Sequence, residues 1–418
     1  MNKKNKLQIV APAGDLLRFK IACIYGADNI YFSGQKYGLR AAANNLCDEE
    51  IIEACTFAKK YNAKPITTVN AIMHDKDLAG ITNYLKFLDE CKVYAVIIAD
   101  PGLIQIIKKN TNLKIHISTQ TSLLNSYTAK MWKSLGADRV VLAREITLKE
   151  AGKIGKDNKI ETEVFGHGAM CMSYSGKCGL STYLSKRDAN RGGCIQACRF
   201  SYQCQNKYQN DKNQNDKNQS DKNQKNLLEN KHPFSSKDLC SIKHIEKFFE
   251  NNISALKIEG RMKSPFYVAT TVKNYRLAID NYLNGTLTSA LLNKLSKNLT
   301  LIPHRDYFDG SLIKLAGENG VYPDNLPTQE NAKAIFIGIV LYISDDFIAI
   351  KNFQPLNKKD KIKILSSTSL DDTKLTLNKF YDITKNLLTS VRQEQVVLIP
   401  KSEKLKNVKQ YEILYKEI

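Results

Sequence analysis

Eight short apolar runs, each followed by an amphipathic stretch or a loop, constrain the fold of this 418-residue chain more than any other feature. In order they read L-Q-I-V, N-I-Y-F-S-G, P-I-T-T-V-N, A-V-I-I-A-D, K-I-H-I-S-T, R-V-V-L-A-R, E-T-E-V-F-G-H and S-A-L-K-I-E-G. Such runs are typical of buried strands, and helical periodicity fills most of the gaps. Eight strand units within residues 1–290 predict a (β/α)8 barrel of the TIM type. An open doubly wound sheet is the alternative, and the count of eight favours the barrel.

Polar side chains stand at the C-terminal end of nearly every one of these runs. They are Tyr31, Ser33, Asn70, Asp100, His116, Thr119, Gln120, Arg144, Glu145, His167, Glu259 and Arg261. Any one of them is more often a strand-end or helix-cap residue than a functional one. In a barrel, however, these ends converge on the face that carries active sites. Their recurrence therefore predicts a polar site at the barrel mouth.

A cysteine-rich segment follows the seventh run. It contains Cys171, Cys178, Cys194 and Cys198, which are surrounded by Gly, Ser, Lys and Arg, and Cys240 follows a polar tract. Thiolates are soft ligands that suit zinc or an iron–sulfur cluster. The spacing Cys-x6-Cys-x15-Cys-x3-Cys does not match the paired C-x2-C of zinc ribbons or bacterial ferredoxins. The segment therefore predicts a metal site at the rim of the barrel and leaves the metal open.

The other cysteines and the N-terminus indicate the cellular compartment. Cys23, Cys47, Cys55 and Cys91 lie in helical patterns, where cysteine is usually a small buried apolar residue. The chain starts M-N-K-K-N-K without a visible signal peptide, and no apolar run is long enough to span a bilayer. We expect a cytoplasmic protein without membrane association, in which structural disulfides are rare.

The formal net charge of +20 leaves two interpretations open. A basic surface attracts nucleic acid by neutralising phosphates. The alternative is a general excess of lysine that is spread over solvated faces. Composition alone does not decide between them.

The remaining patterns divide the chain. We expect the barrel to occupy residues 1–290, with the cysteine-rich insertion at 166–240. Within that insertion, the repeats of Gln, Asn, Asp and Lys over 205–231 predict a disordered, solvated tract. A linker over 291–330 leads to residues 331–418, where short alternating strands predict a small C-terminal β-barrel.

Several motifs make the chain recognisable. E-V-F-G-H-G-A-M-C followed by S-G-K-C-G-L-S resembles the signature of the collagenase-like peptidase family U-32. The resemblance runs from A-P-A-G near the N-terminus through S-S-K-D-L-C and K-I-E-G-R-M-K to near the C-terminus. Chain length, these blocks and the C-terminal barrel are most similar to the tRNA hydroxylation subfamily. The resemblance implies prephenate-dependent hydroxylation of the wobble uridine to 5-hydroxyuridine. It leaves hydroxylation of a ribosomal RNA base and proteolysis as alternatives.

The resemblance also implies a cofactor, its ligands and the partner. It implies a [4Fe–4S] cluster on Cys171, Cys178, Cys194 and Cys240, with Cys198 as the alternative to one of the last two; structural zinc is the other possible metal. It further implies tRNA as the macromolecular partner and prephenate, a small dicarboxylate, as co-substrate.

Side-chain chemistry adds candidates for the reaction implied by the resemblance. We expect Arg144, Arg187 and Arg261, with Asn70, to bind the dicarboxylate, because guanidinium groups pair well with carboxylates. His167, Gln120 and Glu259 are candidates for orienting a flipped base or exchanging protons. A purely structural ion pair of Glu259 with Arg261 is an equal alternative.

Proteolysis finds little support in the motifs. The sequence contains neither an H-E-x-x-H helix nor a G-x-S-x-G elbow. A thiol–imidazole pair of Cys171 and His167 is the remaining route to a nucleophile. A cysteine committed to a metal cannot serve as that nucleophile.

Overall fold

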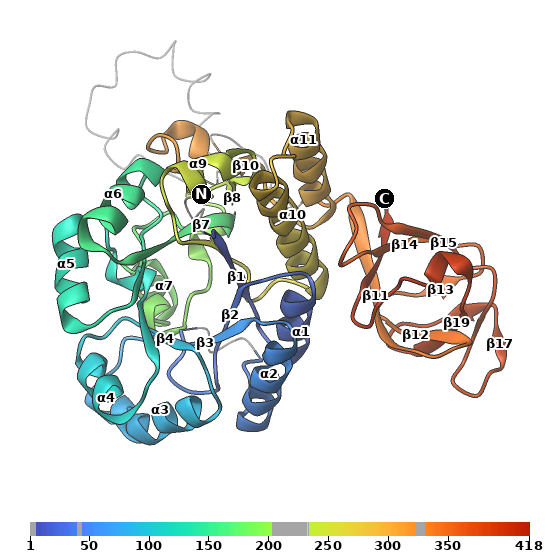
Figure 1. Cartoon of the computed structure of the whole chain (residues 1–418), viewed down its shortest axis with the longest axis horizontal. Helices are drawn as coiled ribbons and strands as arrows, with labels where there is room; N and C mark the ends of the chain where they lie inside the picture. The colour runs from blue at the N-terminus through green and yellow to red at the C-terminus, as the bar shows by residue number, and fades with distance from the viewer. Residues whose placement is uncertain (1–5, 40–43, 203–231, 233, 323–330) are drawn as a thin grey trace, which may run out of the picture.

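A closed parallel barrel forms the larger part of the molecule (Figure 1). The computed structural model describes residues 6–39, 44–202, 232, 234–322 and 331–418, so the tract predicted at 205–231 lies outside the described residues. The barrel strands are β1 (Gln8–Pro12), β2 (Asn29–Phe32), β3 (Lys64–Val69), β4 (Ala95–Ile98), β5 (Lys114–Ile117), β6 (Arg139–Val141), β7 (Glu161–Ala169) and β9 (Ala255–Ile258). Each pairs in parallel with the next, and β9 closes the ring by pairing with both β7 and β1. The predicted (β/α)8 barrel is confirmed.

Helices surround this barrel. They are α1 (Leu16–Ile24), α2 (Asp48–Lys60), α3 (Ile81–Glu90), α4 (Gly102–Asn110), α5 (Ser126–Leu135), α6 (Leu148–Asn158), α9 (Ile245–Glu250) and α10 (Pro265–Leu283). Several begin at a side chain that accepts a hydrogen bond from the first turn, as Asp15 does for α1 and Thr147 for α6. No helix in the described part of the chain is long and apolar enough to cross a membrane.

The cysteine-rich segment extends from the end of β7. It contains the short helix α7 (Leu180–Ser185) and returns as β8 (Asp238–Cys240), which pairs antiparallel with residues 167–169 of β7. Strand β10 (Tyr307–Phe308) then adds to β8 in parallel. The segment is therefore held at the C-terminal end of the barrel, as an insertion after the seventh strand should be.

The C-terminal strands form a second unit with its own apolar core. They are β11 (Ala334–Ile343), β12 (Phe347–Asn352), β14 (Lys361–Leu365), β15 (Thr373–Thr376), β16 (Phe380–Tyr381), β17 (Leu387–Leu388), β19 (Val396–Pro400) and β20 (Ile413–Glu417). Their order is β15-β14-β20-β11-β12-β19-β16-β17, and all pairings are antiparallel. Strands β13 (Leu356–Asn357) and β18 (Ser390–Val391) make a separate pair. The predicted β-barrel is thus an antiparallel half-barrel.

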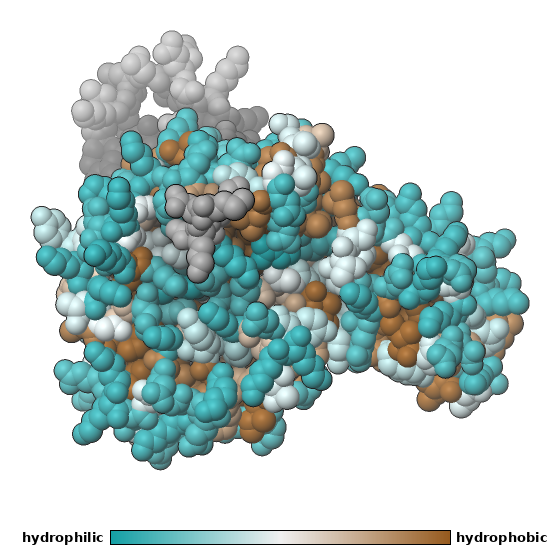
Figure 2. Space-filling model, viewed as in Figure 1, coloured by the Kyte–Doolittle hydropathy of each residue, from teal (hydrophilic) through white to brown (hydrophobic). Residues whose placement is uncertain are grey.

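The half-barrel packs against α1 and α10 of the larger barrel. Tyr25 of α1 donates a hydrogen bond to the Leu365 carbonyl at 2.7 Å and accepts one from the Ile413 amide at 3.1 Å. Phe266 of α10 stacks on Tyr415, with ring centroids 5.2 Å apart. Helix α11 (Ser289–Asn298) lies beside α10 in the connecting segment. Figure 2 shows hydrophilic residues over most of the visible face of both units.

The inside of the barrel holds a buried charge network. Glu163 of β7 is fully buried, 2.6 Å from the Lys257 ammonium of β9 and 3.1 Å from the Arg139 guanidinium of β6. Burial alone would raise the pKa of Glu163, but the two neighbouring cations outweigh it and the pKa is lowered. The carboxylate therefore stays charged and joins three adjacent strands.

Replacing Glu163 tests this network. Glu163→Gln should lower the free energy of unfolding by about 3 to 5 kcal/mol, because it leaves the Lys257 ammonium buried without its counter-charge, while Arg139 keeps its ion pair with Glu161. Lys153→Gln, at the exposed Lys153–Asp157 pair, should cost less than about 0.5 kcal/mol. Urea unfolding of the three proteins measures both values. A Glu163→Gln loss no larger than that of Lys153→Gln would contradict the role assigned to the network.

Candidate functional site at the barrel mouth

A polar cavity of about 110 Å³ lies where the barrel strands end. Three cationic side chains and one carboxylate line it, and these are Arg144, Lys257, Arg261 and Glu259. Asn70, Ser118 and Gln120 also line it. The residues of the predicted set of polar strand ends that line this cavity are Tyr31, Asn70, Thr119, Gln120, Arg144, Glu259 and Arg261.

Arg144 is held by stacking and by charge. Its guanidinium carbon lies 4.0 Å from the centroid of the Phe165 ring, and Nη2 is 3.7 Å from Glu259. Its backbone N–H donates to Ser175 Oγ at 3.3 Å, which ties it to the cysteine-rich segment. Arg261 is buried and donates to Thr68 and Asn45. Glu259 thus forms an ion pair with Arg144.

Asn70 and Arg144 each place at this cavity a buried polar atom that has no hydrogen-bond partner among the described residues. Asn70 donates through Nδ2 to Ser118 Oγ at 3.1 Å, but its Oδ1 is left without a donor. The Nε–H of Arg144 is likewise without an acceptor. Buried polar groups are almost always satisfied, so both atoms indicate a place for a ligand or water.

Four thiols line a second, larger cavity of about 360 Å³. They belong to Cys171, Cys178, Cys194 and Cys198, which come from loops on both sides of α7. Burial raises the pKa of Cys198, and the charges of the other three thiols act in the same direction, which reflects their proximity. The structure thus places in one cavity the four cysteines that the sequence analysis grouped as candidate metal ligands.

Backbone contacts hold this cavity in shape. Gly176 has φ +77°, and a Cβ there would lie 2.2 Å from the Gln120 carbonyl oxygen, so only glycine allows this close approach. Asn190 donates to the Cys178 carbonyl at 3.0 Å. Arg199 donates to the carbonyls of Met170 and Ser236, both at 2.7 Å, and so joins the cysteine loops to the segment before β8.

Cys240 lies outside this cavity, contrary to its expected place beside the first three cysteines. It is a residue of β8, buried, with its sulfur 4.0 Å from the Tyr275 hydroxyl. Burial raises the pKa of its thiol to about 11. The strand direction explains the difference, because pairing with β7 places Cys240 opposite His167 and away from the loops. The alternative residue, Cys198, is the one that joins the group.

The arrangement of the thiols bears on which metal they suit. Within the described residues, no three or more His, Cys, Asp and Glu side chains form a group that could hold a metal ion. Four sulfurs around one zinc ion would lie about 3.8 Å apart, since each Zn–S bond is about 2.3 Å. Here the sulfurs line a cavity of 360 Å³ instead. The four thiols that line one cavity are soft donors of the kind that zinc and iron–sulfur clusters both use.

Two predicted site residues lie elsewhere. His167 is buried against the rings of Tyr267, Tyr275 and Tyr307 and lines neither cavity. Burial lowers its pKa to about 3, so it is neutral at physiological pH. Arg187 is exposed on the loop after α7 and also lines neither cavity. Within the described residues, no hydrogen bond joins His167 to Cys171.

Lys257 was not proposed from the sequence. Its ammonium lies 4.2 Å from the Tyr31 ring centroid and lines the floor of the mouth cavity while pairing with Glu163. Side chains alternate along a strand, so Lys257 shares a face with Glu259 two residues later. That periodicity is the signal that could have identified it.

The two cavities are neighbours. Both are lined by Leu39, Gln120, Cys171 and Gly176. Cys171 therefore stands between the cationic mouth cavity and the other three thiols. A group bound by the thiols would border on a ligand at the barrel mouth.

A (β/α)8 barrel with a polar site at its C-terminal face is the architecture of barrel enzymes. The chain belongs to peptidase family U32, whose model matches residues 14–320. It is 36% identical over 398 residues to tRNA hydroxylation protein P1 of Bacillus subtilis, covering 93% of this chain and 90% of that protein. It is 34% identical over 348 residues to tRNA hydroxylation protein P of Haemophilus influenzae, covering 75% of each. Collagenase of Porphyromonas gingivalis is 30% identical over 318 residues, covering 73% of each.

Because His167 is buried, we expect the free energy of unfolding to fall in acid. Its pKa is about 3 in the folded chain and about 6.5 when unfolded. Between these values the unfolded chain binds a proton that the native chain does not, so stability falls as pH falls, by up to about 1.4 kcal/mol per pH unit. His167→Phe should remove this contribution in urea unfolding from pH 6.5 to 4.5. His74→Phe, at an exposed histidine, should not, and equal slopes for all three proteins would contradict the prediction.

Proposed function

We propose that this protein hydroxylates carbon 5 of the wobble uridine of tRNA in a prephenate-dependent reaction, using a [4Fe–4S] cluster. The proposal rests on one observation. A cavity lined by four thiols adjoins the cationic cavity at the barrel mouth, and Cys171 lines both. The similarity to proteins named for tRNA hydroxylation supports the same reaction.

The proposed cluster ligands are Cys171, Cys178, Cys194 and Cys198. They replace the set with Cys240, whose thiol is buried beside Tyr275 and not beside the other cysteines. A cluster held there would supply redox chemistry next to the base. A structural zinc ion remains the other outcome of metal analysis.

The cysteine cavity also has features that suit a nucleobase. Tyr174 and Phe234 line it and stay 58% and 41% exposed. Large exposed aromatic rings at the entrance of a cavity can stack on an unpaired base, and sequence-specific RNA recognition usually targets such unstacked loop bases. The wobble position lies in such a loop. Gln120, which lines both cavities, is placed to hydrogen-bond the edge of that base.

The mouth cavity suits the carboxylate groups of prephenate. Arg144, Lys257 and Arg261 line it together, and the guanidinium of Arg144 has an unsatisfied Nε–H. Guanidinium groups bind carboxylates with charge-assisted hydrogen bonds. Lys257 already forms an ion pair with Glu163, so the two arginines are the proposed carboxylate ligands.

Proteolysis receives no support from the site. The pair of Cys171 with His167 that a cysteine peptidase would need is not formed, because His167 is enclosed by tyrosines. The pKa of His167, near 3, also makes it a poor general base at neutral pH.

Single cysteine variants test the cluster. Cys171→Ser, Cys178→Ser, Cys194→Ser and Cys198→Ser should each lose iron and sulfide after anaerobic purification, since packing cannot replace a lost metal–thiolate bond. Cys240→Ser and Cys55→Ser, at buried thiols outside the cavity, should keep both. Iron and sulfide analysis with absorbance spectra gives the result. Full retention in Cys198→Ser with loss in Cys240→Ser would overturn the ligand set, and stoichiometric zinc without iron in wild type would overturn the cluster.

Arginine variants test the reaction. Purified protein should convert undermodified tRNA to the 5-hydroxyuridine form only with prephenate present, as measured by nucleoside mass spectrometry. Arg144→Gln should lower kcat/KM for prephenate by about 10- to 100-fold, which corresponds to a lost charged hydrogen bond. Arg187→Gln, exposed and outside both cavities, should leave it unchanged.

Other outcomes separate the alternatives. Product formed equally by Cys171→Ser, or none from wild type with its cluster intact, would refute the proposed reaction. Modification of a ribosomal RNA base in place of tRNA, or peptide cleavage by the same preparation, would assign the site to one of the alternatives.

A further inference from the structure

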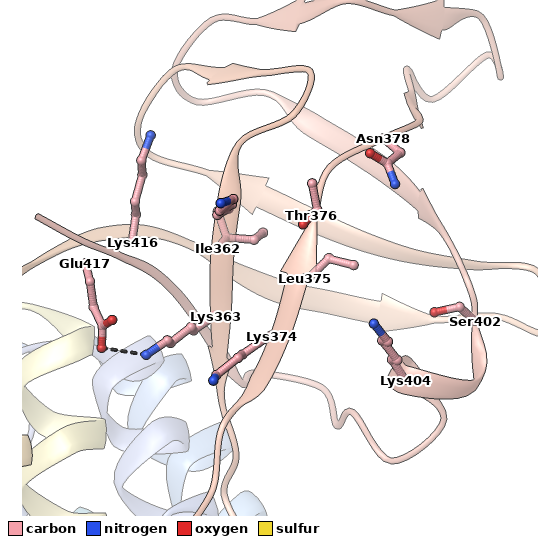
Figure 3. Close-up of a pocket in the computed structure, with 11 residues that line it drawn as sticks. Ile362, Lys363, Lys374, Leu375, Thr376, Asn378, Ser402, Lys404, Lys416 and Glu417 are labelled. Carbon is pink, nitrogen blue, oxygen red and sulfur yellow. Dashed lines mark hydrogen bonds and ion pairs between the residues drawn. The ribbon is translucent and has the colours of Figure 1, made fainter.

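A lysine-lined hollow of about 870 Å³ lies on the half-barrel, away from the site described above (Figure 3). Its walls come from β14, β15, β20 and the 3-10 turn Glu403–Leu405. Five lysines and one carboxylate line it, namely Lys361, Lys363, Lys374, Lys404, Lys416 and Glu417. Lys363, Lys374 and Lys404 come from three different elements, and Figure 3 shows them around the same space.

A second hollow of about 590 Å³ continues the first toward the barrel. The two share Lys363, Lys374 and Glu417. The second adds Lys294 and Lys297 of α11 and also Lys333, which precedes β11. We call the two together the lysine groove, and it spans the junction of half-barrel and barrel.

The side-chain carboxylates in the lysine groove are already paired. Glu417 lies 2.6 Å from Lys363, Asp371 lies 2.8 Å from Lys294, and Asp372 lies 2.7 Å from Lys273. Lys416 pairs with Asp360 at 2.9 Å.

Five lysines of the groove have no carboxylate within ion-pair distance in the described part of the chain. These are Lys297, Lys333, Lys361, Lys374 and Lys404, and all are exposed. Their mutual repulsion favours an anionic partner.

Protection of a sheet edge is the alternative use for such lysines. Strand β15 is the terminal strand of the eight-stranded sheet, and charged residues keep exposed edges from pairing with other chains. That explanation covers Lys374 of β15. It does not cover Lys297, Lys333 and Lys404, which belong to a helix, a connecting segment and a turn.

We propose that the lysine groove binds the phosphate backbone of the tRNA whose anticodon loop enters the barrel mouth. This inference rests on the proposed function for the identity of the RNA. An open, extended track of cations suits a polyanion better than one small phosphate, because several phosphates can each take one lysine. The groove supplies affinity without sequence information, and the mouth supplies base selection.

The test uses two sets of three substitutions with equal charge change. The groove variant carries Lys361→Gln, Lys374→Gln and Lys404→Gln in the full chain. The control variant carries Lys358→Gln, Lys385→Gln and Lys409→Gln, at exposed lysines of the same half-barrel that line neither hollow. Filter binding of undermodified tRNA over a salt series gives the dissociation constants, and thermal melting checks the fold of each variant.

The groove variant should bind tRNA at least tenfold more weakly at low salt. The slope of log affinity against log salt should fall by about two to three, since each lost phosphate contact removes about 0.7 to 0.9. The control variant should match wild type in its affinity at low salt and in its salt slope.

Equal tRNA affinity for the groove and control variants would overturn the inference, and aggregation of the groove variant with unchanged affinity would assign the lysines to edge protection. Equal affinity with normal hydroxylation would leave the proposed function standing. Groove-dependent tRNA binding without hydroxylation by wild type would support the groove and refute the reaction.

Discussion

The buried carboxylate of Glu163 is the contact on which the rest of the structure depends. It brings together Lys257 and Arg139 and so joins β9 and β6 to β7 inside the barrel. These strands flank the point where the chain leaves the barrel to form the cysteine loops and then returns. The strands before and after this insertion are thus held by side-chain charges as well as by backbone pairing. The same network places Lys257 beneath the mouth cavity, so stability and the electrostatics of the site share one set of charges.

The site is built where two kinds of backbone meet. Regular strands present Arg144, Glu259 and Lys257 toward the barrel mouth, while irregular glycine-rich loops carry the thiols. Gly176 lets the loops pack directly on Gln120, and this contact brings Cys171 to the boundary of both cavities. The loops are fixed in turn by Arg199, whose hydrogen bonds reach the segment before β8. The proposed cluster site in the cysteine cavity and the proposed carboxylate site in the mouth cavity therefore depend on the same few contacts.

The structure shows two places where the excess positive charge of the chain is concentrated. Cations occur inside the mouth cavity, where Glu163 and Glu259 offset them, and in the lysine groove, where five remain without a carboxylate partner in the described chain. The first set is buried and positioned, as recognition of a small dianion needs. The second is exposed and flexible, as binding of a phosphate backbone needs. Membership of the family does not by itself assign a function to either set of cations, because the chain is similar both to proteins named for tRNA hydroxylation and to a collagenase.

Sequence by itself determined the barrel, because strand and helix periodicities are local and eight of them leave few topologies. It also determined that polar strand ends such as Asn70, Arg144 and Glu259 meet, since every parallel strand ends at the same face. Tertiary structure alone decided the rest. Cys198 and not Cys240 joins the other thiols, because antiparallel pairing of β8 with β7 carries Cys240 into the core. His167 sits one bulge beyond Phe165, and this irregularity directs it to the tyrosines instead of the mouth. The lysine groove, too, depends on folding, since β15 and the turn at Lys404 become neighbours only when the half-barrel folds, and α11 joins them only when the two units pack.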